Sequence, residues 1–213
     1  YLDSLELGIR AALERSLGRA FVLGTSFRHL RELAARLRPF IEERGWLCLV
    51  QEPGARRSEL LLDFKEHGQA VLFGAASFWE GVDVPGDALS CVIVTRLPFA
   101  VPDTPLERAR QDKIKRQGGE PFKDLSLPEA VLRLKQGFGR LIRHSTDRGW
   151  FVLLDPRVLT KSYGRAFLCS LPACPTWVDG KAVQVGPSRP AAARRPGSAS
   201  RSTPTRRPAK EPK

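Results

Sequence analysis

Two kinds of hydrophobic pattern alternate along the first 170 residues of the chain. Short, continuous apolar runs are typical of strands buried on both faces of a sheet, and they occur at residues 20–23, 46–50, 70–73, 89–97 and 150–154. Between them, apolar residues recur every three or four positions, which predicts helices at residues 3–17, 27–44, 57–66, 104–116, 128–142 and 158–168. This alternation predicts an α/β fold with a mostly parallel sheet and helices on both faces. In such folds ligands bind beyond the carboxyl ends of the strands.

The composition of the chain changes near residue 180. We therefore expect an ordered domain, residues 1–180, and a tail, residues 181–213, which has no aromatic residue and little to bury and is therefore predicted to be disordered. The tail holds nine lysines and arginines and one glutamate, so it carries eight of the twelve net positive charges. It can add a loose, salt-sensitive attraction for nucleic acid, or it can be a solvated end without a specific task.

Simple counts exclude several classes of protein. No apolar run approaches the roughly 18 residues that span a bilayer, and no secretory signal precedes the first helix, so we expect a cytoplasmic protein with no membrane contact. The four cysteines lie in or beside apolar runs without paired spacing, which predicts buried reduced thiols and no metal site: Cys48, Cys91, Cys169 and Cys174. The sequence contains no methionine and begins with a tyrosine, so we expect a piece of a longer polypeptide.

The clearest chemical signal is residues 136–143, Gln-Gly-Phe-Gly-Arg-Leu-Ile-Arg. On a helix that continues through this segment, Gln136, Arg140 and Arg143 share one face. The opposite, apolar face consists of Val131, Leu134, Phe138 and Leu141. Two guanidinium groups that point to one place repel each other unless an anion lies between them, and their planar shape suits phosphate oxygens. Gly139 leaves room for a ligand or another backbone beside Arg140. A plain solvated charged face is the alternative.

A second segment, residues 77–86, follows the predicted strand at residues 70–73. Glu80 and Asp83 lie on either side of Gly81, and a Pro-Gly pair ends the segment. Two acids in this arrangement fit a carboxylate pair for a metal ion, but they fit an ordinary exit from a strand as well.

Two further segments join a strand to a helix. Residues 24–27 place Thr25 and Ser26 at the start of a helix, where a hydroxyl can cap the helix and where the free N–H groups attract phosphate. Residues 96–105 contain three prolines, which stiffen the chain around Phe99. The Phe99 ring is suited to stacking on a base or to filling a core.

Together these segments resemble the DinG/XPD-type helicases of superfamily two, and the DinG branch most closely. Residues 136–143 resemble motif VI, residues 77–86 resemble motif V, and residues 24–27 resemble motif IV; Leu-Pro-Phe followed by Pro-x-x-Pro at residues 97–105 resembles the DinG branch. The resemblance extends over roughly residues 1–172. It implies a three-layer RecA-like domain, the second and C-terminal motor domain of an ATP-dependent DNA helicase. Such a helicase couples ATP hydrolysis to 5′ to 3′ movement on single-stranded DNA and unwinds forked or duplex DNA in repair and replication.

The resemblance also implies roles for single residues. Arg143 would be an arginine finger that stabilises charge on the transferred phosphoryl group, while Arg140 and Gln136 would contact that phosphate or the attacking water. Four residues would border ATP, with the first of them coupling the two motor halves: Glu80, Gly81, Asp83 and Gly139. Four residues would lie on the DNA side: Thr25, Ser26, Ser77 and Phe99. Residues 155–157, Asp-Pro-Arg, resemble a structural turn of the family.

The family's phosphate loop and its Asp-Glu-Ala-His-type motif do not occur in this sequence. We therefore expect ATP and Mg²⁺ to be held mainly by an upstream RecA-like domain of the same polypeptide, and this chain to be inactive alone. An iron–sulfur cluster, which many family members carry, would also lie upstream. The alternative reading is a non-catalytic RecA-like accessory domain that binds nucleic acid.

Overall fold

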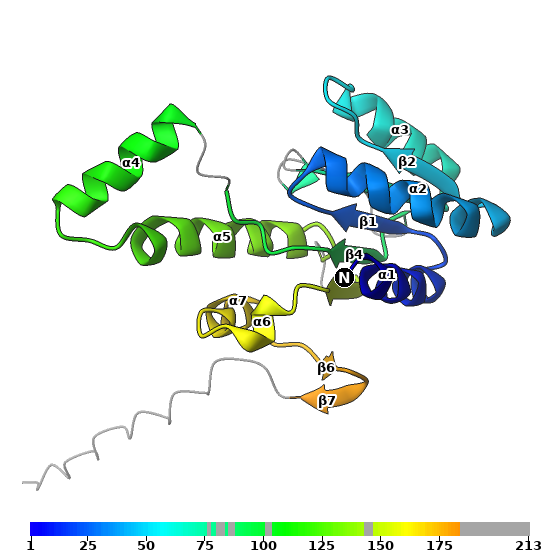
Figure 1. Cartoon of the computed structure of the whole chain (residues 1–213). Helices are drawn as coiled ribbons and strands as arrows, with labels where there is room; N and C mark the ends of the chain where they lie inside the picture. Colours follow the sequence, from blue (N-terminus) through cyan, green and yellow to red (C-terminus); the bar gives the residue numbers. More distant parts are fainter. Residues whose placement is uncertain (76–77, 80–83, 85–87, 101–103, 143–146, 184–213) are drawn as a thin grey trace, which may run out of the picture.

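A computed structural model describes residues 1–75, 78–79, 84, 88–100, 104–142 and 147–183. Its centre is a parallel sheet in the order β2-β3-β1-β4-β5 (Figure 1). The strands are β1 (Ala20–Leu23), β2 (Leu47–Val50), β3 (Ala70–Gly74), β4 (Cys91–Val94) and β5 (Trp150–Leu153). Ala20 pairs with Val71 on one side and with Cys91 on the other, so neighbouring strands begin level with one another. The carboxyl ends of the strands therefore open onto one edge of the sheet.

Helices cover both faces of the sheet because successive side chains of each strand point to opposite sides. Ala20 and Val22 of β1 pack with α1 (Leu2–Ser16) and α2 (Phe27–Glu43). Phe21 and Leu23 instead pack with side chains of α3 (Arg57–His67), α5 (Leu127–Phe138) and α7 (Gly164–Ser170). The predicted α/β fold, with a parallel sheet between two helical layers, is confirmed and fits the RecA-like expectation.

A helical arm extends beyond the sheet (Figure 1). It consists of α4 (Pro105–Arg116), a π-helical turn η3 (Phe122–Ser126) and the first part of α5. Thr104 caps α4 by accepting a hydrogen bond from the Glu107 amide at 3.2 Å, and a proline follows at the first helical position. None of the twelve residues of α4 is buried. Local capping therefore stabilises α4 more than packing does.

The last part of the chain differs from the prediction. The single helix expected at residues 158–168 is two helices, α6 (Arg157–Thr160) and α7. The chain then forms an antiparallel hairpin, β6 (Thr176–Val178) and β7 (Lys181–Val183), which the hydrophobic pattern did not predict. This hairpin lies across residue 180, the boundary that the composition suggested. Nearly all of the tail, residues 184–213, lies outside the described residues.

The cysteines are free thiols, but they are not all buried as predicted. Cys48 and Cys91 are buried, Cys169 is half-buried and Cys174 is exposed. Burial raises the pKa of the Cys91 thiol to about 12, so this sulfur stays protonated and unreactive. Cys174 lies in the segment between α7 and β6.

Candidate functional site

The loops that leave the carboxyl ends of the strands are tied to one another by buried side chains. Thr95, which follows β4, donates its hydroxyl to the Leu23 carbonyl at 3.1 Å, at the end of β1. Gln51, which follows β2, accepts a hydrogen bond from the Ala75 amide at 2.8 Å, just after β3. The Leu23 carbonyl also accepts a hydrogen bond from the Thr95 amide at 3.0 Å, and the Gln51 side chain satisfies the Ala75 amide, so the candidate loops begin from well-defined positions.

The loop after β1 leads into α2 through Gly24, Thr25 and Ser26. Ser26 occupies the N-cap position, with extended backbone angles, but its side chain makes no capping hydrogen bond within the described part of the chain. The explanation of this serine as a helix cap is therefore wrong. Its hydroxyl is exposed beside the open N-terminus of α2, where backbone N–H groups favour a phosphate. Thr25 next to it is half-buried.

The helix that carries the glutamine and arginine signal ends earlier than predicted. α5 stops at Phe138 instead of residue 142, and Gly139 begins a turn in which the Arg140 amide donates to the Gly137 carbonyl at 3.2 Å. Glycine weakens a helix, and Leu141 beyond the turn is buried against the backbone of the chain around Gly149. Leu141 is therefore buried as the apolar pattern predicted, although it lies beyond the end of the helix.

The early end of α5 changes the geometry expected for its polar residues. Gln136 lies on the helix, whereas Arg140 lies in the turn, so the two do not share a helical face as predicted. Both side chains are half-buried. The Gln136 Oε1 atom is buried and has no hydrogen-bond partner among the described residues. An unsatisfied buried acceptor costs about 1–3 kcal/mol, so this oxygen is suited to accept a hydrogen bond from a bound water or ligand.

Trp79, in the segment of residues 77–86, is a residue whose role the sequence pattern did not predict. Trp79 is 2% exposed, and its indole Nε1 donates to the Gly24 carbonyl at 3.3 Å. Its ring also lies against Gly137 of α5, where a Cβ atom would approach the ring to 2.9 Å. A tryptophan between two glycine-containing motifs is the sequence signal that could have indicated this contact.

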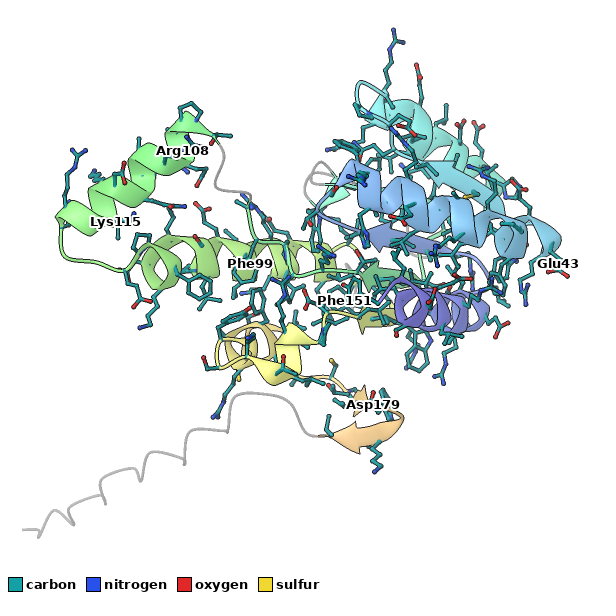
Figure 2. All side chains as sticks on the ribbon, viewed as in Figure 1. Glu43, Phe99, Arg108, Lys115, Phe151 and Asp179 are labelled. Atoms are coloured by element: carbon teal, nitrogen blue, oxygen red, sulfur yellow. The ribbon has the colours of Figure 1, made fainter. Side chains whose placement is uncertain are left out.

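Phe99 lies in a cluster of aromatic rings between α5 and the α6–α7 pair (Figure 2). Its ring centroid is 5.7 Å from that of Phe122, 5.6 Å from that of Tyr163 and 5.6 Å from that of Phe167. These contacts fasten the helical arm to the body of the domain. They favour the core-filling role of Phe99 over stacking on DNA.

Several candidate residues lie outside the described part of the chain: Ser77, Glu80, Gly81, Asp83 and Arg143. Three residues next to the first four candidates are described: Phe78, Trp79 and Val84 are each buried to at least 98%. The described residues on either side of positions 80–83 thus lie on the face of the sheet that α5 covers.

A metal site of this chain's own finds no support among the described residues. They contain no group of three histidine, cysteine or acidic side chains that could hold an ion, and none of their helices is long and apolar enough to cross a membrane. A cavity of about 610 Å³ lies between β5 and the β6–β7 hairpin, but Asp179 is the one charged residue of its described lining. Such a cavity does not suit a phosphate.

The sequence is similar to a known domain family and to several named proteins. Residues 9–174 match the helicase C-terminal domain family. The chain is 46% identical over 171 residues to the ATP-dependent DNA helicase YoaA of Haemophilus influenzae. These 171 residues are 80% of this chain and 26% of that protein. It is 42% identical to the ATP-dependent DNA helicase DinG of Photobacterium profundum, over 72% of this chain and 22% of that protein. It is 43% identical to the 3′-5′ exonuclease DinG of Bacillus subtilis, over 71% of this chain and 16% of that protein. The chain thus spans about a quarter, or less, of the length of these relatives.

Proposed function

Because the chain belongs to the helicase C-terminal domain family and is of the DinG type, we propose that residues 1–180 act as the second motor domain of an ATP-dependent DNA helicase. In this proposal, ATP binds between this domain and an upstream RecA-like domain of the same polypeptide. Closing and opening of the two domains around ATP moves them 5′ to 3′ along single-stranded DNA and unwinds forked or duplex DNA. Repair and replication in the cytoplasm are the setting that we infer.

The observation that carries the proposal is the arrangement at the end of α5. Gln136 presents a buried oxygen without a described partner, and Arg140 follows in the turn that ends the helix. An amide oxygen can accept a hydrogen bond from the attacking water and so orient it, while a guanidinium neutralises charge on the phosphate; phosphoryl transfer needs both. We assign those tasks to Gln136 and Arg140, and the arginine finger to Arg143. Gly139, Gly81, Asp83 and Glu80 complete the ATP side.

The DNA side of the proposal rests on the start of α2. The exposed Ser26 hydroxyl and the free N–H groups of the first turn form a site for a phosphate of the DNA backbone, and Thr25 lies beside them. We place Ser77 on the same side, because its segment also follows a strand at the carboxyl edge. Phe99 contributes by fixing the helical arm.

The other half of the catalytic site must come from outside this chain. The described residues contain no carboxylate cluster for Mg²⁺, so we infer that the upstream domain holds Mg²⁺ and most of the ATP, and that this chain alone does not hydrolyse ATP. An iron–sulfur cluster, if the protein has one, belongs to that domain as well. Relatives named as ATP-dependent DNA helicases favour this motor role over a non-catalytic accessory domain.

Steady-state ATP hydrolysis by the full-length polypeptide, with and without single-stranded DNA, tests the proposal. We expect DNA to stimulate the wild-type protein, and Arg143→Ala to lower turnover by about 10³-fold or more, as loss of an arginine finger does. Arg140→Ala should also reduce turnover. Lys135→Ala is the matched control, because Lys135 is an exposed cation of the same helix. Equal turnover by the wild type and Arg143→Ala would disprove the assignment, and unchanged DNA binding without any hydrolysis would favour the accessory domain.

A further inference from the structure

Trp79 links three segments that are distant in the sequence. Its indole N–H donates to the Gly24 carbonyl, 55 residues away, over 3.3 Å. The six-membered part of its ring, at Cε3 and Cζ3, lies 2.9 and 3.0 Å from the position that a Cβ of Gly137 would occupy. The ring is 2% exposed, so it is held on all sides. The loop after β1, the loop after β3 and α5 therefore meet at one side chain.

The two partners of Trp79 adjoin the two halves of the proposed site. Gly24 directly precedes Thr25 and Ser26, which we place against DNA. Gly137 directly follows Gln136, which we place against the attacking water. Because Gly24 and Gly137 have no side chains, the indole ring contacts the main chain directly at both residues. A shift of the ring therefore moves the main chain at Gly24 and at Gly137.

The structure gives neither contact much freedom to absorb such a shift. The Gly24 amide is bonded to the Gly74 carbonyl at 3.1 Å, which fixes the end of β1 from the other side. Gly137 is buried and also faces Leu23, whose Cδ1 atom is 3.6 Å from the Cβ position. Closely packed interiors of this kind pass displacements on instead of compressing.

We propose that Trp79 is a positioning residue that couples the DNA contact at Thr25 and Ser26 to the phosphate-side residues Gln136 and Arg140. The inference rests on the proposed function. Tryptophan suits this task because its side chain combines a large flat ring with a hydrogen-bond donor at the ring edge. Phenylalanine would retain an aromatic ring in the core but would leave the buried Gly24 carbonyl without its donor.

The first test is Trp79→Phe in the full-length protein, with ATP turnover measured in the presence and absence of single-stranded DNA. We expect the stimulation by DNA to fall roughly tenfold, the size of one buried hydrogen bond, while turnover without DNA and the Kd for single-stranded DNA change less than about twofold. A purely structural role would lower all three together. Trp46→Phe is the matched control, since Trp46 is a buried tryptophan of the cluster on the opposite face and contacts Phe40.

The second test approaches the same contact from α5. Gly137→Ala places a methyl group on the indole ring and should also reduce the stimulation by DNA. Because the phenylalanine side chain lacks the second ring, adding Gly137→Ala to Trp79→Phe should cost less than adding it to the wild type. Thermal unfolding shows whether Trp79→Phe folds. If it does not, Gly137→Ala alone tests the proposal, through its effect on the ratio of ATP turnover with DNA to turnover without DNA.

The outcomes separate this inference from the proposed function. A wild-type protein that DNA does not stimulate contradicts the proposed function itself. If DNA stimulates ATP turnover of Trp79→Phe as strongly as that of the wild type, the role of Trp79 is overturned. Additive effects of Trp79→Phe and Gly137→Ala would overturn it as well. In both cases the proposed motor function remains.

Discussion

At the scale of single residues, Asp155 shows how one buried charge holds two loops in place. Its carboxylate is 2% exposed, accepts the Leu97 amide at 2.8 Å, and forms an ion pair with Arg157 at 2.6 Å. Burial alone would raise the pKa of Asp155, but the hydrogen bonds from Arg157 and the Leu97 amide outweigh it and keep that pKa below its ordinary value. The structural turn expected at residues 155–157 is therefore also the tie between the exits of β4 and β5.

The lowered pKa of Asp155 predicts how stability depends on pH. The stabilisation is complete above the ordinary carboxyl pKa of about 3.9 and is lost as the pH falls through the lower pKa of the folded protein. At pH 7, Asp155→Asn should lower the free energy of unfolding by about 2 kcal/mol, or the Tm by roughly 4–8 °C. Thermal unfolding from pH 7 to pH 3 checks this, with Asp63→Asn, an exposed acid of α3, as the control. A difference that does not shrink towards acid pH would contradict the charge-based explanation.

At the scale of elements, the break between α6 and α7 has a backbone cause. A Cβ atom on Gly164 would lie 2.0 Å from the Val158 carbonyl oxygen, so α7 can approach α6 closely only because its first residue is glycine. A hydrophobic pattern contains no information on this approach, since glycine is neutral in the pattern. The chain leaves the helical conformation at Lys161, which has extended backbone angles, so the continuous helix predicted for residues 158–168 is split into two.

Gly164→Ala should force the two helices apart. Since a carbonyl cannot move aside as a side-chain end can, we expect the free energy of unfolding to fall by about 3 kcal/mol, or the Tm by roughly 6–12 °C. Arg165→Ala, an exposed change on the same helix, should leave both nearly unchanged. Chemical denaturation of the two variants side by side is the measurement, and equal midpoints would show that the helix pair adjusts freely.

At the scale of the whole molecule, charge is distributed very unevenly. Residues 181–213 carry eight of the twelve net positive charges, and the first of these residues belongs to the β6–β7 hairpin. The domain itself is only mildly basic. The tail is therefore the part of the chain whose contribution to nucleic-acid affinity should depend most on salt.

Removing residues 184–213 should weaken binding of single-stranded DNA at low salt. The slope of log Kd against log salt should decrease by about 0.7 for each tail cation that contacts a phosphate. Titrations over a series of salt concentrations measure this slope, and a tail of equal length with glutamine in place of arginine and lysine separates charge from length. Slopes that stay the same would leave the tail as a solvated end without a specific task.

Much of the fold could be predicted because its rules are local. A strand buried on both faces must be apolar throughout, as β1 and β3 are, and an amphipathic helix such as α2 repeats its apolar residues at a helical period. The residue types of the site were equally visible: two arginines and a glutamine close together, and hydroxyls after a strand. The arrangement of these residues could not be predicted, because α5 ends at Phe138 and the Ser26 side chain makes no capping hydrogen bond in the described part of the chain.

The sequence by itself determined the succession of strands and helices along the chain as far as β5 and the chemical groups available to the candidate site, since both depend on neighbours within a few positions. Only the tertiary structure decided where α5 ends, that the Ser26 hydroxyl is exposed, and that Trp79 joins Gly24 to Gly137. The bond from Trp79 to Gly24 joins segments 55 residues apart, and the segment beyond the end of α5 is held by packing of Leu141 against the chain at Gly149. A hydrophobic pattern records that a side chain is buried, but it does not record which backbone the side chain is buried against.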